Sequence, residues 1–140
     1  MLIHTDAVEA RAITVPALAT KTFVSIAKRD AAGELPVAPY LVIHPADGED
    51  SQERVSGPRS AQNPAFTFHV VGTSYSNCQQ VTELLKAKFF TAGVPIQINV
   101  TGERGRAMRW SSPQPTQVDN DMTPPLIYNV VEVSWISEPV

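Results

Sequence analysis

The side chains best suited to chemistry are few in this chain and stand far apart in the sequence. The three histidines are His4, His44 and His69, and the only cysteine is Cys78. None of the histidines has a histidine, cysteine or acidic residue at the spacing that metal sites use. His69 and Cys78 are conceivable as a base and a nucleophile, but Cys78 falls on the apolar stripe of an expected helix, where thiols are buried and inert. The sequence therefore predicts core packing for Cys78 and structural, hydrogen-bonded histidines, with no catalytic residue, no metal and no cofactor.

Two short motifs and one acidic cluster are typical of exposed turns rather than of ligand sites. Residues 119–121, Asp-Asn-Asp, lack the glycine and the closing glutamate of a calcium loop. Residues 102–106, GERGR, lack the Gly-Lys-Ser/Thr of a phosphate loop and precede an expected strand, so they predict a hairpin turn. The polar stretch 45–62 predicts a long exposed loop. A solvated turn is the better interpretation of its acidic side chains, although an acidic loop could also face DNA and keep it from sticking; they are Asp47, Glu49 and Asp50.

Arginine side chains are the strongest candidates for contacts between subunits. The planar guanidinium pairs with carboxylates through two hydrogen bonds, and arginine is enriched at interfaces. For each arginine singly, a solvated strand face is an equally good interpretation. Phe90 lies off the apolar stripe of its helix by about a third of a turn, so it either sits under the helix end or meets another subunit. The candidate interface residues are Phe90, Arg54, Arg59, Arg104, Arg106 and Arg109.

The elements that must position these residues are short. Twelve prolines interrupt the apolar runs and favour extended connections between them. A short helix is expected at 5–13, with Asp6 and Glu9 in capping-box spacing, and Pro16 ends it. Alternating or continuous apolar runs predict strands. The expected strands are 20–27, 40–44, 65–72, 96–101, 106–111 and 126–136.

A longer helix follows strand 65–72. It begins near Ser74 or Ser76, the latter with Gln79 in capping-box spacing. Gly93 is expected to be its left-handed C-cap, and Pro95 prevents its continuation. Its apolar residues step by three, four and four positions and therefore share one face; they are Cys78, Val81, Leu85 and Phe89.

Runs of strands joined by turns, with few helices, predict an α+β fold. We expect a curved antiparallel or mixed sheet, with one main helix and a short N-terminal helix packed on one face. Strand 126–136 is apolar on both faces in its first half, so it is expected to be central or to lie at an interface. The length suits a single domain, 1–140, that buries roughly two thirds of the surface of its unfolded form.

Composition narrows the class of function. The net charge is −3 and the basic residues are dispersed, which disfavours binding of duplex nucleic acid as the main function. The single cysteine agrees with folding in a reducing compartment. The N-terminus lacks the features of a signal peptide, and no apolar run approaches the roughly 20 residues that span a bilayer. We expect a soluble chain that folds in the cytosol and has no membrane partner.

Several segments in a fixed order carry a resemblance to one family. They are PYLVIHPADG (39–48), RVSGPRSAQNPAFTFHVVGTS (54–74), the helix ending in Gly93, GRAMRWSSPQP (105–115) and DNDMTPPLIYNVVEVSWIS (119–137). Over residues 39–137 the chain resembles the tail terminator proteins of long, non-contractile-tailed bacteriophages, also called tail completion or head–tail joining proteins. The N-terminal part departs from the family, whose members open with a longer amphipathic helix.

The resemblance implies a structural virion protein and not an enzyme. Copies of the subunit would form a hexameric ring at the head-proximal end of the tail tube, stop tube growth and join the tail to the head connector or head-closure protein. DNA would pass through the lumen without being read. The ring would be assembled in the host cytoplasm and found in the neck of the virion. The alternatives are a head-closure, connector or tube protein of the same region, or a small cytosolic ligand-binding domain or enzyme that uses His44, His69 and the acidic loop.

Overall fold

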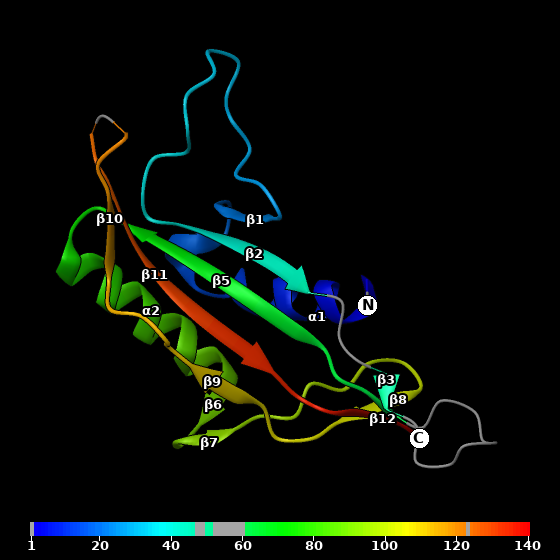
Figure 1. The fold of residues 1–140 in the computed structure, drawn as a ribbon. Coiled ribbons are helices and arrows are strands. Elements are labelled where there is room, and N and C mark those ends of the chain that lie inside the picture. Colours follow the sequence, from blue (N-terminus) through cyan, green and yellow to red (C-terminus); the bar gives the residue numbers. More distant parts are fainter. Residues whose placement is uncertain (1, 47–49, 52–60, 123) are drawn as a thin grey trace.

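A six-stranded mixed sheet runs through the centre of the molecule (Figure 1). The computed structural model describes residues 2–46, 50–51, 61–122 and 124–140. The strands lie in the order β1-β2-β5-β11-β10. Both β10 and β9 pair with the edge of β11 that faces away from β5: β10 pairs with its first residues and β9 with its last. Their bounds are β1 Thr22–Val24, β2 Tyr40–Ala46, β5 Ala65–Gly72, β9 Arg109–Ser111, β10 Gln117–Asp119 and β11 Leu126–Ser134.

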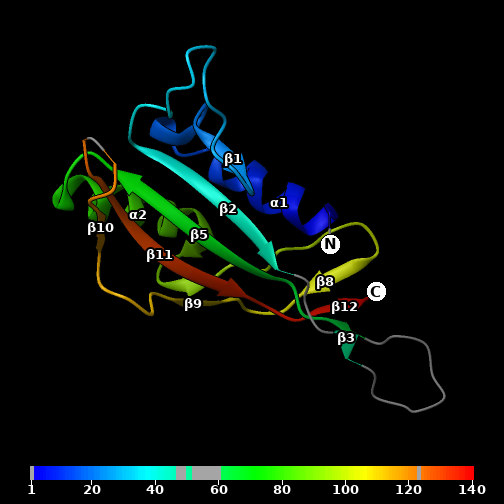
Figure 2. The ribbon, with the colours of Figure 1, turned by 45° about the horizontal axis from the view of Figure 1, so that its top comes forward.

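A long arm projects from one end of this sheet. Every pairing in the sheet is antiparallel except that of β1 with β2, which is parallel. Parallel neighbours need a long connection, because the chain must return to the end of the sheet at which it started. This connection, residues 25–39, leaves the sheet where β2 begins (Figures 1 and 2), and we call it the arm. The turn between β10 and β11 extends from the same end.

Two helices lie on one face of the sheet (Figures 1 and 2). The first, α1 Leu2–Ala12, is followed by a short 3₁₀ turn, η1 Pro16–Leu18, and the second, α2 Tyr75–Phe89, packs on β5 and β11. Because successive side chains of a strand alternate between faces, every second residue of β5 points toward these helices. The largest buried side chains between the helices and the sheet form the main core; they are Leu18, Leu41, Ile43, Phe66, Phe68, Leu85 and Phe89.

The other face of the sheet, which we call the open face, has no helix over it among the described residues (Figure 2). Near the arm it carries a smaller apolar cluster, in which Tyr40, Val42 and Val71 are buried. Side chains from the arm, from β1 and from the start of β11 pack against this cluster; they are Phe23, Ala27, Ala38, Leu126 and Tyr128. Farther from the arm, the same face carries His44 and His69.

A smaller four-stranded sheet lies at the end of the molecule away from the arm (Figure 1). Its strands lie in the order β3-β4-β12-β8, with bounds β3 Asp50–Ser51, β4 Ala61–Gln62, β8 Glu103–Gly105 and β12 Ser137–Pro139. The last strand, β12, follows β11 after two residues, so one run of chain contributes to both sheets. A two-stranded hairpin, β6 Phe90–Thr91 and β7 Val94–Pro95, follows α2.

The predicted fold class is confirmed: the chain is α+β, with a mixed sheet, a main helix and a short N-terminal helix. Strand 65–72 has the predicted bounds, and β11 lies inside its sheet, between β5 and the pair β9 and β10. The apolar stripe of α2 is buried as predicted; the exposed fractions of Cys78, Val81, Leu85 and Phe89 are all 3% or less.

The predicted helix ends need correction. The first helix begins at Leu2, so Asp6 and Glu9 lie within it and do not form a capping box. It ends at Ala12, and Pro16 opens η1 instead of stopping the helix. A proline at the first position of such a turn loses no hydrogen bond, because that N–H has no partner within the turn.

The ends of α2 also differ from the prediction in part. Ser74, not Ser76, is its N-cap, and the Ser74 hydroxyl accepts a hydrogen bond from the backbone N–H of Asn77 at 3.2 Å. Gly93 has the predicted left-handed backbone, with φ of 77°, but it lies in the β6–β7 turn. It is not a helix cap, because Phe90 is already extended and ends the helix three residues earlier.

Several predicted strands have different bounds. Residues 96–101 form no strand and make a single bridge, Val100 to Glu103. The segment is irregular, and its Ile98 side chain is buried in the main core. The expected strand 106–111 is replaced by β8 before it and β9 within it. Part of the expected loop 45–62 is strand, because β2 continues to Ala46 and both β3 and β4 lie within that range. The expected strand 20–27 shortens to β1, and β10 forms in a stretch with no predicted strand.

Candidate functional site

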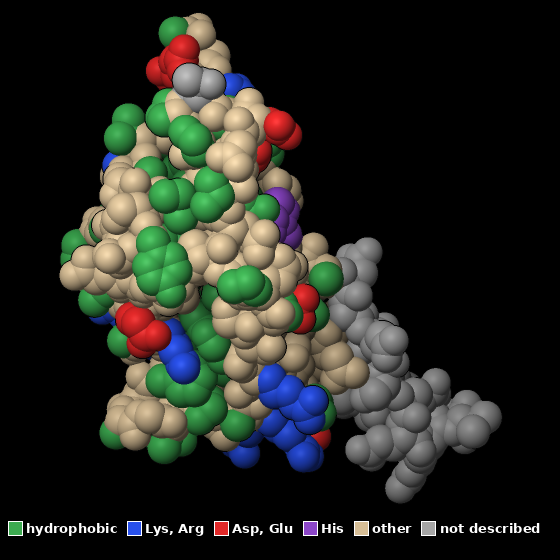
Figure 3. Space-filling model, turned by 60° about the vertical axis from the view of Figure 1, so that its left-hand side comes forward, with side chains coloured by type: hydrophobic (Ala, Val, Ile, Leu, Met, Phe, Trp, Pro, Cys, Tyr) green, Lys and Arg blue, Asp and Glu red, His purple; other side chains and the backbone are tan. Residues whose placement is uncertain are grey.

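Three of the predicted interface arginines lie at the end of the molecule away from the arm. Arg104 is on β8, Arg106 follows that strand and Arg109 begins β9, and all three side chains are exposed. We call these three residues the basic end. Several Lys and Arg side chains gather at the lower end of the view in Figure 3. The Arg106 guanidinium also contacts the Glu138 carboxylate at 2.6 Å, a pair that is largely solvated because the Arg106 side chain is 65% exposed.

A surface hollow of about 470 Å³ adjoins the basic end. Arg106 and Arg109 line it together with Ile136 and part of Trp135. Its walls thus offer two guanidinium groups beside apolar surface, which is the composition that protein interfaces favour. The hollow suits a side chain with a carboxylate, or a mixed polar and apolar edge, from another protein surface.

Phe90 is half-buried and packs within its own chain. Its ring meets the edge of Trp110, with the ring centres 6.1 Å apart, and the Lys86 ammonium lies 5.3 Å from the ring centre. Of the two alternatives that the sequence left open, the contact under the helix end is therefore present. A role of Phe90 between subunits stays a prediction.

The other candidates cannot be placed fully. Arg54, Arg59, Asp47 and Glu49 lie outside the described residues. Asp50 begins β3, where its backbone pairs with that of Gln62.

His44 and His69 lie side by side on the open face. In the register of β2 with β5, Val42 is opposite His69 and His44 is opposite Thr67, so the two histidines are diagonal neighbours. Their ring centres are 4.6 Å apart, with the ring planes at 60°. Burial, and next the charge of His44, lower the pKa of His69. The sequence spacing of the histidines gave no sign of this contact, because strand register brings the two side chains together.

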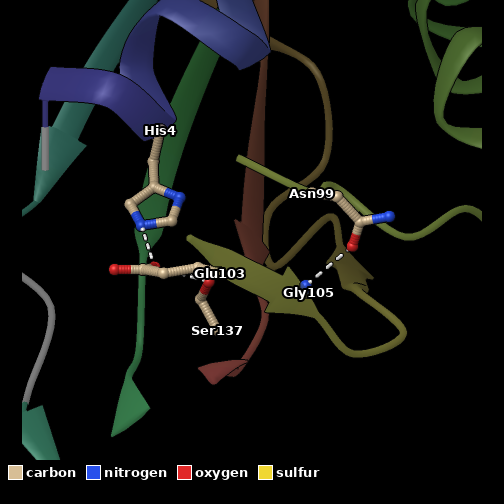
Figure 4. A network of polar contacts seen from close by, with 5 residues as sticks. All are labelled: His4, Asn99, Glu103, Gly105 and Ser137. Carbon is tan, nitrogen blue, oxygen red and sulfur yellow. Dashed lines mark hydrogen bonds and ion pairs between the residues drawn. The ribbon is translucent and has the colours of Figure 1, made fainter. Parts of the chain in front are cut away.

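The remaining histidine, His4, forms a buried polar cluster with the small sheet (Figure 4). Its Nε2 lies 2.9 Å from a carboxylate oxygen of Glu103, and the same oxygen accepts a hydrogen bond from the Ser137 hydroxyl at 2.7 Å. The distance between His4 and Glu103 is that of an ion pair. The geometry is not that of a hydrogen bond, and within the described structure neither ring nitrogen of His4 makes one. His4 is fully buried, so a substrate has no access to it. The cluster joins α1 to β8 and β12, and its residues are too far apart in the sequence for spacing to indicate the contact.

The imagined pair of His69 and Cys78 does not form. His69 points to the open face, whereas Cys78 is fully buried on the opposite side, where α2 packs on the sheet. The thiol donates a hydrogen bond to the backbone oxygen of Val70, with Sγ and O 3.2 Å apart, and burial raises the pKa of Cys78. A buried, protonated thiol is a poor nucleophile, so the prediction of core packing is confirmed.

The acidic residues of the described structure do not converge on an ion. Asp119 accepts a hydrogen bond from the backbone N–H of Asp121 at 3.0 Å, which makes 119–121 the exposed turn predicted from the sequence. No group of three or more His, Cys, Asp or Glu in the described ranges is placed to hold a metal.

Sequence reasoning missed a buried polar network around Asn129. Its side-chain amide donates to the Thr82 hydroxyl at 2.9 Å, and the Thr82 hydroxyl donates to the backbone oxygen of Cys78 at 2.8 Å. On its other side, Asn129 accepts a hydrogen bond from Thr116, which in turn accepts one from Gln79. The network fixes α2 against β11. The only signal in the sequence was an asparagine between apolar residues of a strong strand.

No family model matches the chain, and no curated protein matches it significantly. Within the described residues, neither helix is both long enough and apolar enough to cross a membrane.

Proposed function

We propose that this chain is a structural virion protein, a tail terminator whose copies form a hexameric ring at the head-proximal end of a phage tail tube. The resemblance supports this, because its segments build one continuous unit of the fold. They contribute β2, β5, α2, β9 and β11, which are neighbours in the main sheet or pack on it. The N-terminal residues outside the resemblance add α1, η1, β1 and nearly all of the arm.

The observation that carries the proposal is the different character of the two ends of the molecule. The arm bears two large apolar side chains, Ile26 and Val37, each 77% exposed. The opposite end bears the exposed arginines and the hollow beside them. Two unlike surfaces at different places on one subunit permit head-to-tail contacts, and such contacts close into a ring when the rotation between neighbours is right.

The mechanism is geometric. A closed ring on the end of the tail tube covers the surface to which the next tube subunit would add, so growth stops. Its outer face is then available to the connector or head-closure protein. DNA passes through the lumen without being held, which suits a chain whose net charge is −3 because a basic lumen would retain duplex DNA.

The test is a tube-assembly reaction. Purified chain is added to the polymerising tail tube protein of the same phage, and tube lengths and ends are measured by electron microscopy. We expect a density at one end of each tube and shorter tubes as the chain is added. A variant with Arg106→Glu and Arg109→Glu should keep the fold, judged by circular dichroism, and should lose this effect. Tubes of unchanged length without a terminal density, or incorporation of the chain along the shaft, would contradict the proposal.

The second candidate is a small ligand-binding protein, and the contact of His44 with His69 favours it. It predicts that His69→Ala abolishes function while assembly is unaffected by changes at the basic end. The ring proposal predicts the reverse: tube capping survives His69→Ala and is lost when the arginines are changed. The same assembly reaction therefore separates the two candidates.

A further inference from the structure

The open face of the main sheet holds two imidazoles at a distance that suits a shared metal ion. A nitrogen of a histidine lies ~2.0–2.1 Å from a bound Zn²⁺, which puts the ring centre about 3 Å from the ion. Two ring centres 4.6 Å apart, as in His44 and His69, then subtend an angle near 90–100° at an ion between them. This angle lies between the octahedral and tetrahedral values, so the separation of the two rings is compatible with binding of one ion by both.

The surroundings of the pair leave room for such an ion. His44 and His69 are both only partly buried, and histidine side chains reach the surface in Figure 3. The other groups on this face are the Thr67 hydroxyl, opposite His44, and the Tyr128 ring, whose centre is 5.7 Å from that of His69. Glu132 is opposite Thr67 on the next strand and is exposed. No basic side chain of β2, β5 or β11 competes for the place, since these strands carry none.

Neutral imidazole is the form that binds metals, so an ion at this place would compete with protons for the ring nitrogens.

We propose that His44 and His69 form a two-histidine site for a divalent transition-metal cation that links β2 to β5 on the open face. Imidazole nitrogens select zinc, copper and nickel over calcium and magnesium. The described residues supply two ligands and no third His, Cys, Asp or Glu in a cluster, so water completes the coordination and the ion exchanges freely. The site is independent of the proposed ring, because neither the basic end nor the arm takes part in it.

A bound ion would stabilise the folded chain, since it binds the paired strands and not the separated ones. It would also compete with protons, so its effect should disappear on acidification.

The experiment uses tag-free protein, because a histidine tag would bind the same ions. Ni²⁺ and Zn²⁺ are titrated calorimetrically at about pH 7.5, and thermal unfolding is followed with and without each ion. We expect saturable binding of one ion per chain and a higher midpoint of unfolding, neither of which Mg²⁺ should produce. Both effects should weaken as the pH is lowered, because protons compete with the ion for the ring nitrogens.

Two substitutions and one matched control assign the ligands. His44→Gln and His69→Gln are changes at partly exposed positions, so both variants should keep the native circular dichroism spectrum. Each should weaken binding by roughly tenfold or more, on the scale seen when groups that support a metal site are removed. Glu132→Gln removes an acidic side chain of the same face that is opposite Thr67 and is not a proposed ligand, so it should leave the affinity nearly unchanged. As a second readout, Ni²⁺ should broaden the imidazole NMR signals of His44 and His69 at substoichiometric amounts.

Absence of binding by the unaltered protein at millimolar ion would overturn the proposal. So would binding that the double variant His44→Gln/His69→Gln retains, because the ion would then be held elsewhere in the chain. The metal-binding test does not involve tail tubes. Its outcome therefore does not depend on whether the chain caps tubes, and the two proposals can fail separately.

Discussion

At the scale of single residues, the environment of each histidine decides its behaviour. His4 is fully buried beside a carboxylate, whereas His44 and His69 share a partly exposed face. The three residues are equivalent in the sequence, since each stands among mainly apolar or small neighbours. Tertiary structure alone distinguishes His4, which links two elements, from His44 and His69, which lie side by side on the open face.

The contact of His69 with His44 should affect how the stability of the fold depends on pH. The pKa of His69 is lowered in the folded state, while in the unfolded chain it is ~6.5. Below that pH the unfolded chain binds the proton more readily, so the free energy of unfolding should fall as the pH drops from ~7 toward the folded-state pKa. Urea unfolding between about pH 5 and 8 with a chelator present measures this. The titratable groups near His69 on the open face are His44, Tyr128 and Glu132.

The control for this prediction is His69→Gln, which should flatten the acid side of that profile. An unaltered slope in the variant would show that other groups carry the pH dependence.

Removing the carboxylate beside His4 should destabilise the fold. Glu103→Gln should lower the free energy of unfolding by about 1–3 kcal/mol, because a buried polar ring loses its charged neighbour. Glu138→Gln is the matched control: it breaks the solvated pair with Arg106 and should cost less than ~0.5 kcal/mol. A double-mutant cycle of Glu103→Gln with His4→Leu measures the coupling. A coupling free energy indistinguishable from zero would contradict the pairing.

At the scale of elements, α2 shows how local signals and packing combine. Its apolar stripe places it on β5 and β11, and the Asn129 network fixes it there. Gly72, at the end of β5, lets the first turn of the helix approach closely: a Cβ on Gly72 would lie 2.6 Å from the Cα of Cys78. The strand-to-helix joint thus depends on a residue without a side chain.

The N-cap of α2 can be tested with a neighbouring control. Ser74→Ala removes the acceptor of the Asn77 N–H and should lower the free energy of unfolding by ~1 kcal/mol. Ser76→Ala, two residues on and inside the helix, should change it by less than ~0.5 kcal/mol. Equal effects of the two substitutions in urea unfolding would mean that the cap does not act as the geometry indicates.

The sequence was sufficient where the signal is local and periodic. Strand 65–72 and the stripe of α2 were predicted because alternation and helical spacing are read within one segment. It was insufficient where the partners are distant in the sequence. The register of β2 with β5 places His44 beside His69, and the contact of His4 with Glu103 joins a helix to a strand far along the chain. The segment 96–101 alternates like a strand but finds no strand to pair with, so pattern alone misled there.

At the scale of the whole molecule, the chain has two unlike ends. Exposed apolar side chains on the arm lie at one end, and the basic end and its hollow lie at the other. A subunit of this kind can join copies of itself head to tail, as the proposed ring requires.

The arm should contribute to self-association. Ile26→Ser combined with Val37→Ser removes the two side chains that are 77% exposed and should weaken association by about tenfold or more, since burial of each stabilises a contact by ~1.5–3 kcal/mol. Leu2→Ser is the control, because Leu2 is 75% exposed but lies on α1, away from the arm. Sedimentation velocity over a range of concentrations gives both values. Equal weakening by the control would remove the arm from the interface.

The central claim is that copies of this chain close into a ring. The most direct measurement is electron microscopy of the purified protein, fixed by light chemical cross-linking at high concentration or while bound to tail tubes. We predict closed, six-fold averages with a central opening, both free and at tube ends. Particles of single-subunit size under both conditions, or open filaments without closure, would contradict it.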